Sequence, residues 1–304
     1  MGQIKYENFM SDNVENLELP VSVVIATLGG DTLSDTLERL NCGTKLPAEI
    51  LICIPEEYLD NVVEVTTFPN INIIKTDCRG QVAQRAVGLE MAKYDFVMQC
   101  DDDVILPPDT LEGLFNTLRE KGPGNVVAPF FRIQGSGVDG TRYVVGIKGF
   151  LTDIYFALIC GASFGKKRFG RIASSGVGFG VLMGMESERL IESEWLPGGV
   201  VMCCRGDLIT DNYYPFSGKA FSEDLMHSIL WRKRGCRLWT LLDVSAMVDV
   251  TAESFSKVSL VGRYMAHAYV AKLGDGNVWR TRLWFFFYCL LNMRNIIADN
   301  QRHK

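Results

Sequence analysis

Three consecutive acids, Asp101, Asp102 and Asp103, directly follow a short apolar run, Phe96–Cys100. The run has the pattern of a buried strand, so the carboxylates stand where that strand leaves its sheet. Adjacent carboxylates repel one another and are costly to desolvate unless a cation or a polar ligand compensates them. Hard oxygen ligands suit Mg²⁺ or Mn²⁺, and Mg²⁺ sites commonly combine one or two carboxylates with substrate phosphates. The triple acid therefore predicts a site for a divalent metal, or for an anionic diphosphate that brings its metal along.

A second pair of acids, Glu223 and Asp224, opens a predicted helix that begins at Ser222 and stops at Gly235. Acids in a first helical turn interact favourably with the macrodipole, so helix capping alone would explain them. The local sequence leaves two interpretations open, a helix start and a functional site. His227, one turn further on, is by itself typical of a helix surface.

Two polar residues, Gln81 and Arg85, share one face of a predicted helix over 79–93. They either face solvent or contact a phosphate or a base. Gly29 and Gly30 form a loop after the first predicted strand, but they lack the GxGxxG spacing, and the chain has no Walker sequence. These absences argue against a dehydrogenase and against a P-loop enzyme.

The elements that must position these residues alternate between strands and helices. Strands are predicted at 21–27, 49–54, 71–75, 96–100, 126–131, 142–147, 200–203 and 236–242, helices begin near 31, 79, 109 and 222, and 161–184 is predicted to be a loop. This order predicts an α/β fold with a mostly parallel central sheet flanked by helices. Right-handed crossovers would place every strand's carboxyl end on one edge, beside Thr27 and the triple acid.

Size and composition restrict the class of protein. The chain has 304 residues, of which 47% are apolar and 22% charged, as is ordinary for a globular protein. The net charge of −5 argues against a general nucleic-acid binder. The nine cysteines form no CxxC pair. Their odd count and the absence of an N-terminal signal peptide predict a reduced, cytoplasmic setting.

The last part of the chain is basic and aromatic. Residues 256–304 hold eight Lys or Arg against two Asp, and the stretch 279–288 combines aromatic residues with Arg280 and Arg282. Two interpretations stay open: a helix that packs on the main domain, and an interfacial helix on the anionic inner leaflet of a membrane. The most apolar run, Leu283–Leu291, is too short to cross a bilayer.

Four pieces of the sequence occur in a recognisable order. They are VSVVIAT at 21–27, RGQVAQRAVGLEMAKYDFVMQCDDD at 79–103, Pro197-Gly198-Gly199, and FSEDLMHSILWRKRG at 221–235. In these pieces, which lie within roughly Leu19–Leu242, the chain resembles the family-2 glycosyltransferases, which are inverting enzymes of the GT-A fold, in particular those of the bacterial surface-polysaccharide type. The resemblance implies a lead-in at 1–18, a GT-A catalytic domain at 19–245, and a helical, aromatic and basic segment at 246–304. The nucleotide-sugar half of the domain would extend to about residue 130, and the acceptor half would follow.

The resemblance also implies roles for the first group of candidate residues. The triple acid is similar to the family's DXD motif, in which Asp101 and Asp102, with Thr27 and Arg85, would contact the nucleotide-sugar donor. Asp103, together with Asp101, would hold Mn²⁺ or Mg²⁺ on the donor diphosphate.

For the second group the resemblance implies roles on the acceptor side. Asp224 would be the general base that takes the proton from the acceptor hydroxyl as this attacks the anomeric carbon. A single displacement at that carbon inverts its configuration. Gly198, Gly199 and Glu223 would lie near the acceptor. A metal that stabilises the departing diphosphate and a positioned base are consistent with this chemistry.

The chain departs from the family pattern at two points. After the second strand, relatives often carry an acid that reads the base of the nucleotide, and here the sequence is Ile54-Pro55-Glu56-Glu57. After the last strand, many relatives place a metal-ligating His, and here Met247-Val248-Asp249 stands. Asp249 is the candidate to replace that ligand.

The expected protein is thus a metal-dependent hexosyl- or N-acetylhexosaminyltransferase. Its expected partners are a nucleotide sugar, with a UDP-sugar favoured, a glycan or lipid-linked acceptor, and a peripheral contact with the cytoplasmic face of the inner membrane, but no nucleic acid. One alternative is a nucleotidyltransferase on a similar sheet, although Leu28–Asp31 lacks the Gly-x-Gly-x-Arg pattern of such enzymes. The other is a non-catalytic nucleotide-binding relative, against which the presence of Asp224 argues.

Overall fold

The computed structural model describes residues 17–62, 68–134, 143–182, 188–249 and 254–302. Its centre is a nine-stranded sheet in the order β3-β2-β1-β4-β8-β6-β9-β5, with β7 paired to β9. The strands are β1 Glu18–Ala26, β2 Leu46–Pro55, β3 Ile71–Thr76, β4 Phe96–Cys100, β5 Val104–Ile105, β6 Asn125–Gln134, β7 Leu190–Ser193, β8 Val200–Cys204 and β9 Arg237–Asp249. Apart from 142–147, the predicted strands are confirmed, with ends that differ by at most three residues, except that β9 continues to Asp249, seven residues beyond the predicted end. The predicted lead-in, 1–18, lies mostly outside the described residues.

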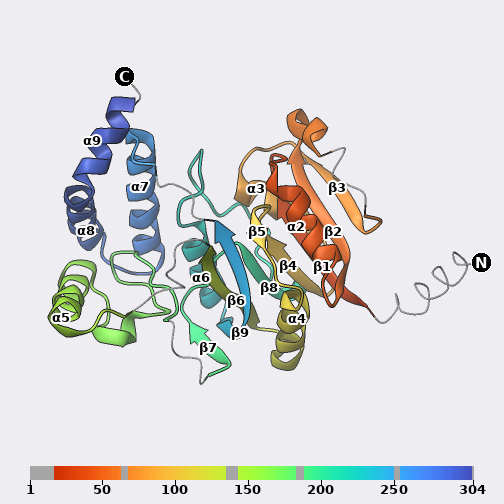
Figure 1. The fold of residues 1–304 in the computed structure, drawn as a ribbon, viewed down its shortest axis with the longest axis horizontal. Coiled ribbons are helices and arrows are strands. Elements are labelled where there is room, and N and C mark those ends of the chain that lie inside the picture. The colour runs from red at the N-terminus through yellow and green to blue at the C-terminus, as the bar shows by residue number, and fades with distance from the viewer. Residues whose placement is uncertain (1–16, 63–67, 135–142, 183–187, 250–253, 303–304) are drawn as a thin grey trace, which may run out of the picture.

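Helices cover the sheet and extend beyond it (Figure 1). They are α2 Thr32–Asn41, α3 Gln81–Met91, α4 Thr110–Lys121, α5 Gly146–Tyr155, α6 Glu223–Lys233, α7 Lys257–Leu273, α8 Val278–Leu291 and α9 Met293–Arg302. A π-helical turn, Phe156–Cys160, continues α5. The predicted helical C-terminal segment is confirmed, and α7, α8 and α9 stand together at the opposite end of the molecule from β3 (Figure 1). None of the described helices has the length and apolarity to cross a bilayer.

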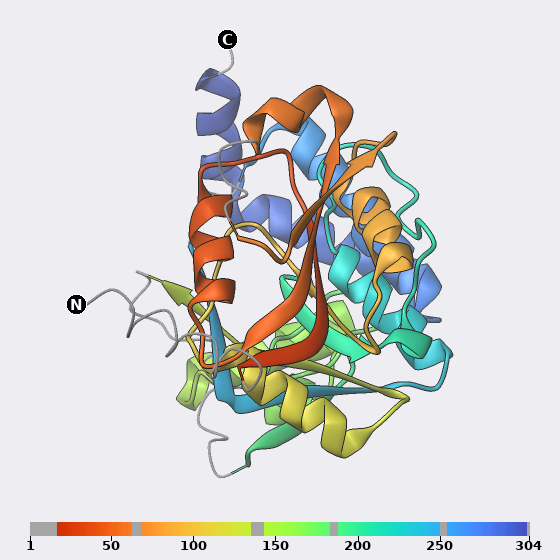
Figure 2. The same ribbon diagram turned by 90° about the vertical axis from the view of Figure 1, so that its right-hand side faces the viewer.

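The first strands pack their two faces against different helices. Alternate residues of β1, such as Val23 and Val24, point to opposite faces of the sheet, as the two-residue period of a strand requires. Val23 belongs to the core that includes Leu37 of α2, and Val24 to the core that includes Leu89 of α3. Figure 2 shows α2 and α3 on opposite sides of these strands. The β-branched run thus forms a fully buried strand, because both of its faces are covered.

The strand directions are mixed. β3, β2, β1 and β4 are mutually parallel, as predicted, and β6 is parallel to β9. The expectation that every strand ends on one edge is wrong for β8, which runs antiparallel to β4 and to β6. Cys100 pairs with Val200, and the N–H of Asp101 donates to the carbonyl of Gly199 at 2.8 Å. The reversal therefore places the start of β8 beside the end of β4, where the triple acid lies.

The segment 142–147 is not the predicted strand, because Gly146 begins α5. Val145, the residue before the helix, has extended dihedral angles, and Gly146 has a positive φ of 78° that glycine tolerates. The apolar pattern that suggested a strand continues at helical spacing through Ile147 and Leu151. Asp31 and Asp109 precede α2 and α4, near the predicted helix starts, but neither side chain caps its helix.

The contact between α3 and the sheet depends on Gly88. A Cβ at this position would overlap Sγ of Cys53 and Cγ1 of Val24. We expect Gly88→Ala to lower the free energy of unfolding by about 1–3 kcal/mol through overpacking, although alanine is the better helix former. Urea unfolding measures the change, with Glu90→Ala on the exposed face of α3 as the control, expected within about 0.5 kcal/mol of the wild type. A Gly88→Ala chain as stable as this control would contradict the close packing.

Candidate active site

A buried arginine joins the two acidic segments. The side chain of Arg85, on α3, is 2% exposed, and it donates to Asp101 at 2.7 Å and to Glu223 at 3.1 Å. Burial alone would lower the pKa of Arg85, but the charges of Glu223 and Asp101 outweigh this effect and raise it. The guanidinium therefore stays charged and holds the end of β4 against the start of α6. Arg85 does not line the cavity described below, and direct contact with a nucleotide remains a prediction.

The three consecutive acids form a turn between β4 and β5, and each has a different environment. Asp101 is half-buried and accepts hydrogen bonds from Gln81 and Arg85. Its burial, opposed by the charge of Arg85, raises the pKa of Asp101 to about 6. Asp102 accepts a hydrogen bond from the hydroxyl of Thr27, and Asp103 is exposed to solvent.

The second acidic pair begins α6, and its two residues have different environments. Glu223 is buried and binds Arg85 and the hydroxyl of Tyr213, so it supports the structure. Asp224 is half-buried, and its carboxylate accepts a hydrogen bond from the N–H of Leu225 at 2.9 Å. The residue before the pair, Ser222, has a left-handed φ of 53°, a strained conformation for a non-glycine residue.

Asp224 has an unusual protonation equilibrium. Burial, followed by the negative charge of Glu223, raises the pKa of Asp224 to about 7. The more distant charge of Asp101 acts in the same direction. A carboxylate that titrates near neutral pH can accept a proton from a bound hydroxyl and release it afterwards. The local sequence left helix capping open as an explanation, but Ser222 makes no side-chain cap and Asp224 has this shifted pKa.

The turn Gly198-Gly199 lies between the two acidic segments. A Cβ on Gly198 would come within 2.7 Å of Glu223 Oε1 and 3.3 Å of Asp224 Cβ. A Cβ on Gly199 would lie 3.2 Å from the ring of Phe131 and 3.5 Å from Asp101 Oδ2. Glycine at both positions therefore lets the backbone pass between the acids. The structure brings both predicted glycines to the candidate site.

A cavity of about 830 Å³ opens beside these residues. It is lined by Thr27, Leu28, Gln81, Gln84 and Asp102, and also by Arg79 and the loop Ser217–Ala220. Arg79 and Lys219 were not predicted, although they give the cavity its two positive charges. Gln84 was also missed, and it fixes the loop after β1 by donating to the carbonyls of Thr27 and Cys53 at 2.8 and 2.9 Å. The prediction used only the four-residue spacing of Gln81 and Arg85, although Gln84, three residues after Gln81, lies on the same side of α3 and lines the same cavity.

A second cavity of about 580 Å³ shares Arg79 with the first. Its lining includes Glu56, Glu57, Thr76 and Asp77. The sequence departs from the family pattern at Ile54-Pro55-Glu56-Glu57, and the structure places both glutamates of that segment at this cavity.

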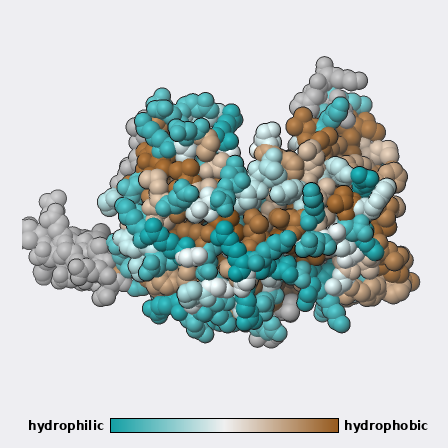
Figure 3. Space-filling view, turned by 180° about the vertical axis from the view of Figure 1, so that it is seen from behind, coloured by the Kyte–Doolittle hydropathy of each residue, from teal (hydrophilic) through white to brown (hydrophobic). Residues whose placement is uncertain are grey.

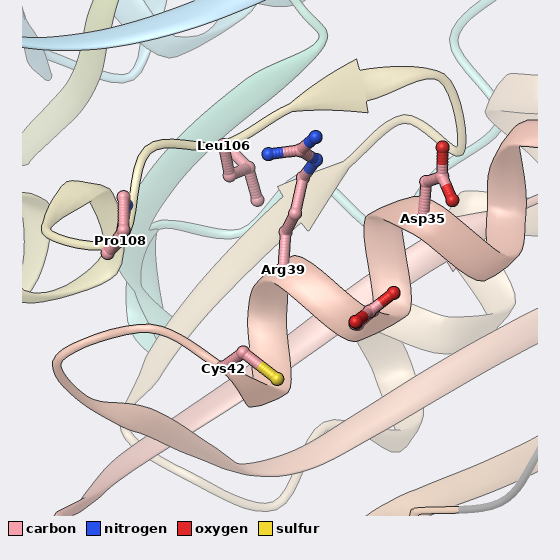
Figure 4. A pocket seen from close by; sticks show the side chains of 6 residues that line it. Asp35, Arg39, Cys42, Leu106 and Pro108 are labelled. Atoms are coloured by element: carbon pink, nitrogen blue, oxygen red, sulfur yellow. The ribbon is translucent and has the colours of Figure 1, made fainter.

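A smaller cavity of about 310 Å³ lies between α2 and the segment after β5. Figure 4 shows Asp35, Arg39 and Cys42 along α2, with Arg39 extending toward Leu106. None of the predicted site residues lines it. It is therefore separate from the candidate active site.

The donor set fits a divalent cation that is completed by a substrate. Among the residues that the structure describes, no three His, Cys, Asp or Glu side chains converge to hold a metal by themselves. The acids at 101–103 offer hard oxygen ligands, and Asp102 lines the cavity. Mg²⁺ sites of this kind typically take their remaining ligands from substrate phosphates and water. Asp249 ends β9, and its side chain lies outside the described part of the structure.

The sequence suggested that His227 lies on a helix surface, but the structure buries it. Its ring is 1% exposed and is stacked on Trp231, with the ring centroids 3.5 Å apart. In the described part of the chain, neither ring nitrogen has a hydrogen-bond partner. Burial lowers the pKa of His227 well below its ordinary value, so the ring is neutral at physiological pH.

Comparison with known proteins identifies the class. The family model of glycosyl transferase family 2 matches residues 22–171. These residues include the triple acid, Thr27 and Arg85. Together with the nine-stranded α/β sheet, this match shows that the chain contains a glycosyltransferase family 2 domain with a GT-A fold. No curated protein matches the chain significantly.

Solved structures share the fold at low sequence identity. A crystal structure of GalNAc-T7 with UDP, GalNAc and Mn²⁺ is 16% identical with a TM-score of 0.56, and the alignment covers 95% of this chain and 59% of that one. The chain thus spans less than two thirds of that protein's length. Residues 1–349 of S. aureus TarS, in complex with UDP-GlcNAc, are 15% identical with a TM-score of 0.53, covering 86% of this chain and 69% of that one.

The raised pKa of Asp224 has a consequence for stability. Its pKa in the folded chain, about 7, lies above the ordinary value of 3.8, so folding favours the protonated form. This contribution is fully present below pH about 4 and is lost as the pH rises through about 7. We expect Asp224→Asn, which cannot ionise, to unfold at a higher temperature than the wild type above pH 7, and the difference to shrink toward pH 5.

Thermal unfolding across this pH range measures the difference, and Asp211→Asn, at an exposed position, is the matched control. Asp101 also titrates in the range, but it is present in both chains. A difference between Asp224→Asn and the wild type that does not change with pH would show that Asp224 has an ordinary pKa.

Proposed function

We propose that the protein transfers a sugar from a nucleotide-diphosphate donor to an acceptor hydroxyl, with inversion at the anomeric carbon. The observation that carries this proposal is Asp224, a carboxylate with a pKa of about 7 in the same cluster as the triple acid. The glycosyltransferase family 2 domain supplies the reaction class. Single displacement needs one base on the acceptor side and a stabilised leaving group on the other, and the two acidic segments meet both requirements.

The donor binds in the 830 Å³ cavity. The cationic side chains of Arg79 and Lys219 suit the negative charge of a diphosphate, and Thr27 and Asp102 line the same wall. Asp103, with Asp101, would hold Mn²⁺ or Mg²⁺ on that diphosphate, where the cation supplies Lewis-acid stabilisation of the leaving group. Arg85 acts indirectly, because its 2.7 Å contact holds the carboxylate of Asp101 in place.

Asp224 is the general base. Its carboxylate is held at the first turn of α6, and Glu223 beside it is fixed by Arg85 and Tyr213. The negative charge of Glu223 raises the affinity of Asp224 for a proton, which strengthens it as a base near neutral pH. Gly198 keeps the space next to Asp224 free of a side chain, so that an acceptor hydroxyl can approach.

The substrates follow from chemistry and from the solved structures. GalNAc-T7 was crystallised with UDP and Mn²⁺, and TarS with UDP-GlcNAc. We propose a UDP-hexose or UDP-N-acetylhexosamine as the donor, and a glycan or lipid-linked glycan of bacterial surface-polysaccharide assembly as the acceptor. The reaction would take place in the cytoplasm, where nucleotide sugars are the activated donors.

Removal of the base tests the mechanism. We expect Asp224→Asn to lower the rate of transfer by about 10²–10⁴-fold, because a positioned base contributes that much. UDP and Mn²⁺ should still bind, since Asp224 does not line the donor cavity. Transfer is measured as UDP release, and binding as the thermal shift caused by UDP with Mn²⁺. Asp211→Asn controls for the loss of one exposed carboxylate, and full activity of Asp224→Asn would show that another group is the base.

The donor site is tested with nucleotides alone. We expect UDP with Mn²⁺ to raise the unfolding temperature, because a ligand at 100 times its Kd adds about 2.7 kcal/mol to the stability. The shift should shrink in Lys219→Ala, which loses a cationic wall of the cavity, and in Asp103→Asn, which loses a ligand of the cation. Lys233→Ala, on the last turn of α6, is the control. Equal shifts in Lys219→Ala and Lys233→Ala would place the diphosphate elsewhere.

A further inference from the structure

Helix α8 exposes an apolar stripe instead of burying it. The side chains of Trp279 and Phe286 are 74% and 58% exposed, and Leu283 and Leu290 are exposed at the same helical spacing. The opposite face of the helix contains the buried Trp284. A helix that turns large aromatic residues to water on one whole face marks an interaction surface.

Helix α5 and its π-helical extension, which pack against α8, also expose apolar side chains. On α5 and its π-helical extension, Ile147 is 80% exposed and Leu158 is 67% exposed, and Phe150 and Leu151 are exposed between them. Arg280 of α8 donates to the carbonyls of Ala157 and Leu158, which fixes the two helices side by side. We call this surface the α5–α8 face; it consists of Ile147, Phe150, Leu151, Leu158, Trp279, Leu283, Phe286 and Leu290. Figure 3 shows apolar surface gathered over this lobe of the molecule.

The two chain segments that carry the α5–α8 face are basic. Residues 143–171 and 276–298 contain eight Lys or Arg and a single acid, Asp153. That acid is 2% exposed and is neutralised by the buried Arg168. The exposed charges of these two segments, such as those of Lys148 and Arg282, are therefore all positive. Arg171 pairs with Glu194, and Asp275 and Asp299 flank the second segment. The guanidinium of Arg282 lies 4.7 Å from the centre of the Trp279 ring, so a cation and an aromatic residue share one part of the face.

We infer that the α5–α8 face docks on the surface of an anionic lipid bilayer. Its apolar side chains would enter the boundary between headgroups and acyl chains, and its Lys and Arg side chains would contact the lipid phosphates. The charge selects this occupant. A second copy placed by twofold symmetry would bring the same positive residues against these, whereas anionic lipids offer negative headgroups above apolar chains. The inference goes beyond the proposed reaction and does not depend on it.

One short segment ties this face to the candidate active site. Residues 161–178 run from the end of the π-helical turn to Gly178, where a Cβ would come within 2.6 Å of Leu225. Leu225 follows Asp224 in α6. On the way, the carbonyl of Gly176 contacts the ring of His267 in α7 at 2.9 Å. A chain docked by the α5–α8 face would thus hold the helix of the candidate base at a fixed position relative to the lipid.

Flotation of the full-length chain with vesicles tests the inference, without any nucleotide sugar. We expect the chain to float with vesicles of phosphatidylcholine and phosphatidylglycerol, and much less with phosphatidylcholine alone. The double variant Trp279→Ser, Phe286→Ser should lose more than about tenfold in binding, because each side chain contributes about 1.5–3 kcal/mol when buried. Lys148→Gln and Lys167→Gln should each lower it about fivefold, since a basic residue near the surface contributes about 1 kcal/mol.

The control is the double variant Ile73→Ser, Met91→Ser, which removes exposed apolar side chains from the opposite half of the molecule. It should float as the wild type does. Three results would overturn the inference: a folded chain that does not bind anionic vesicles, a Trp279→Ser, Phe286→Ser chain that binds as well as the wild type, or a dimer in sedimentation that this variant converts to monomers. Because no substrate is present, a failure of docking is distinguishable from a failure of the proposed transfer.

Discussion

The buried guanidinium of Arg85 is the contact on which the candidate site depends. It connects three elements, because Arg85 lies on α3, Asp101 follows β4, and Glu223 begins α6. A buried charge is tolerated only when it is paired, and removal of either carboxylate would leave the buried guanidinium with one partner in place of two. The same contact balances part of the negative charge of Asp101 and Glu223. Asp224 has no ion-pair partner in the described part of the chain, and its pKa is raised.

Backbone geometry supplies the second constraint. The antiparallel pairing of β4 with β8 fixes the turn at Gly198 and Gly199 against both acidic segments. Side chains at these two positions would meet Glu223, Phe131 and Asp101. The cavity wall and the candidate base are therefore held by main-chain hydrogen bonds of the sheet, and the loop that carries Lys219 closes the cavity from another part of the chain. A rigid frame with one loop over the cavity suits a site that must admit and release a large donor.

Local patterns predicted most of the fold and part of the site. Phe96–Cys100 forms β4 with the predicted bounds, because a buried apolar strand that ends in three acids has a clear signal in the sequence. The link from Arg85 to Glu223 could not be predicted from residue spacing, since it joins positions 138 residues apart through the pairing of β4 with β8. The same holds for Lys219, which reaches the cavity only through the tertiary fold. The segment 142–147 was predicted as a strand because its aromatic and β-branched residues Tyr143, Val144 and Val145 are typical of strands, but its last two residues begin α5.

The charges of Asp101 and Asp224 are coupled, so the protonation of Asp224 depends on the charge at Asp101. The negative charge of Asp101 helps to raise the pKa of Asp224, so any positive charge that settles on Asp101 lowers it. At neutral pH, close to its pKa of about 7, Asp224 is partly protonated. A divalent cation held on Asp101, as proposed above, would favour the ionised form of Asp224. Binding at the proposed donor site would thus change the protonation of Asp224 through charge alone, with no movement of the backbone.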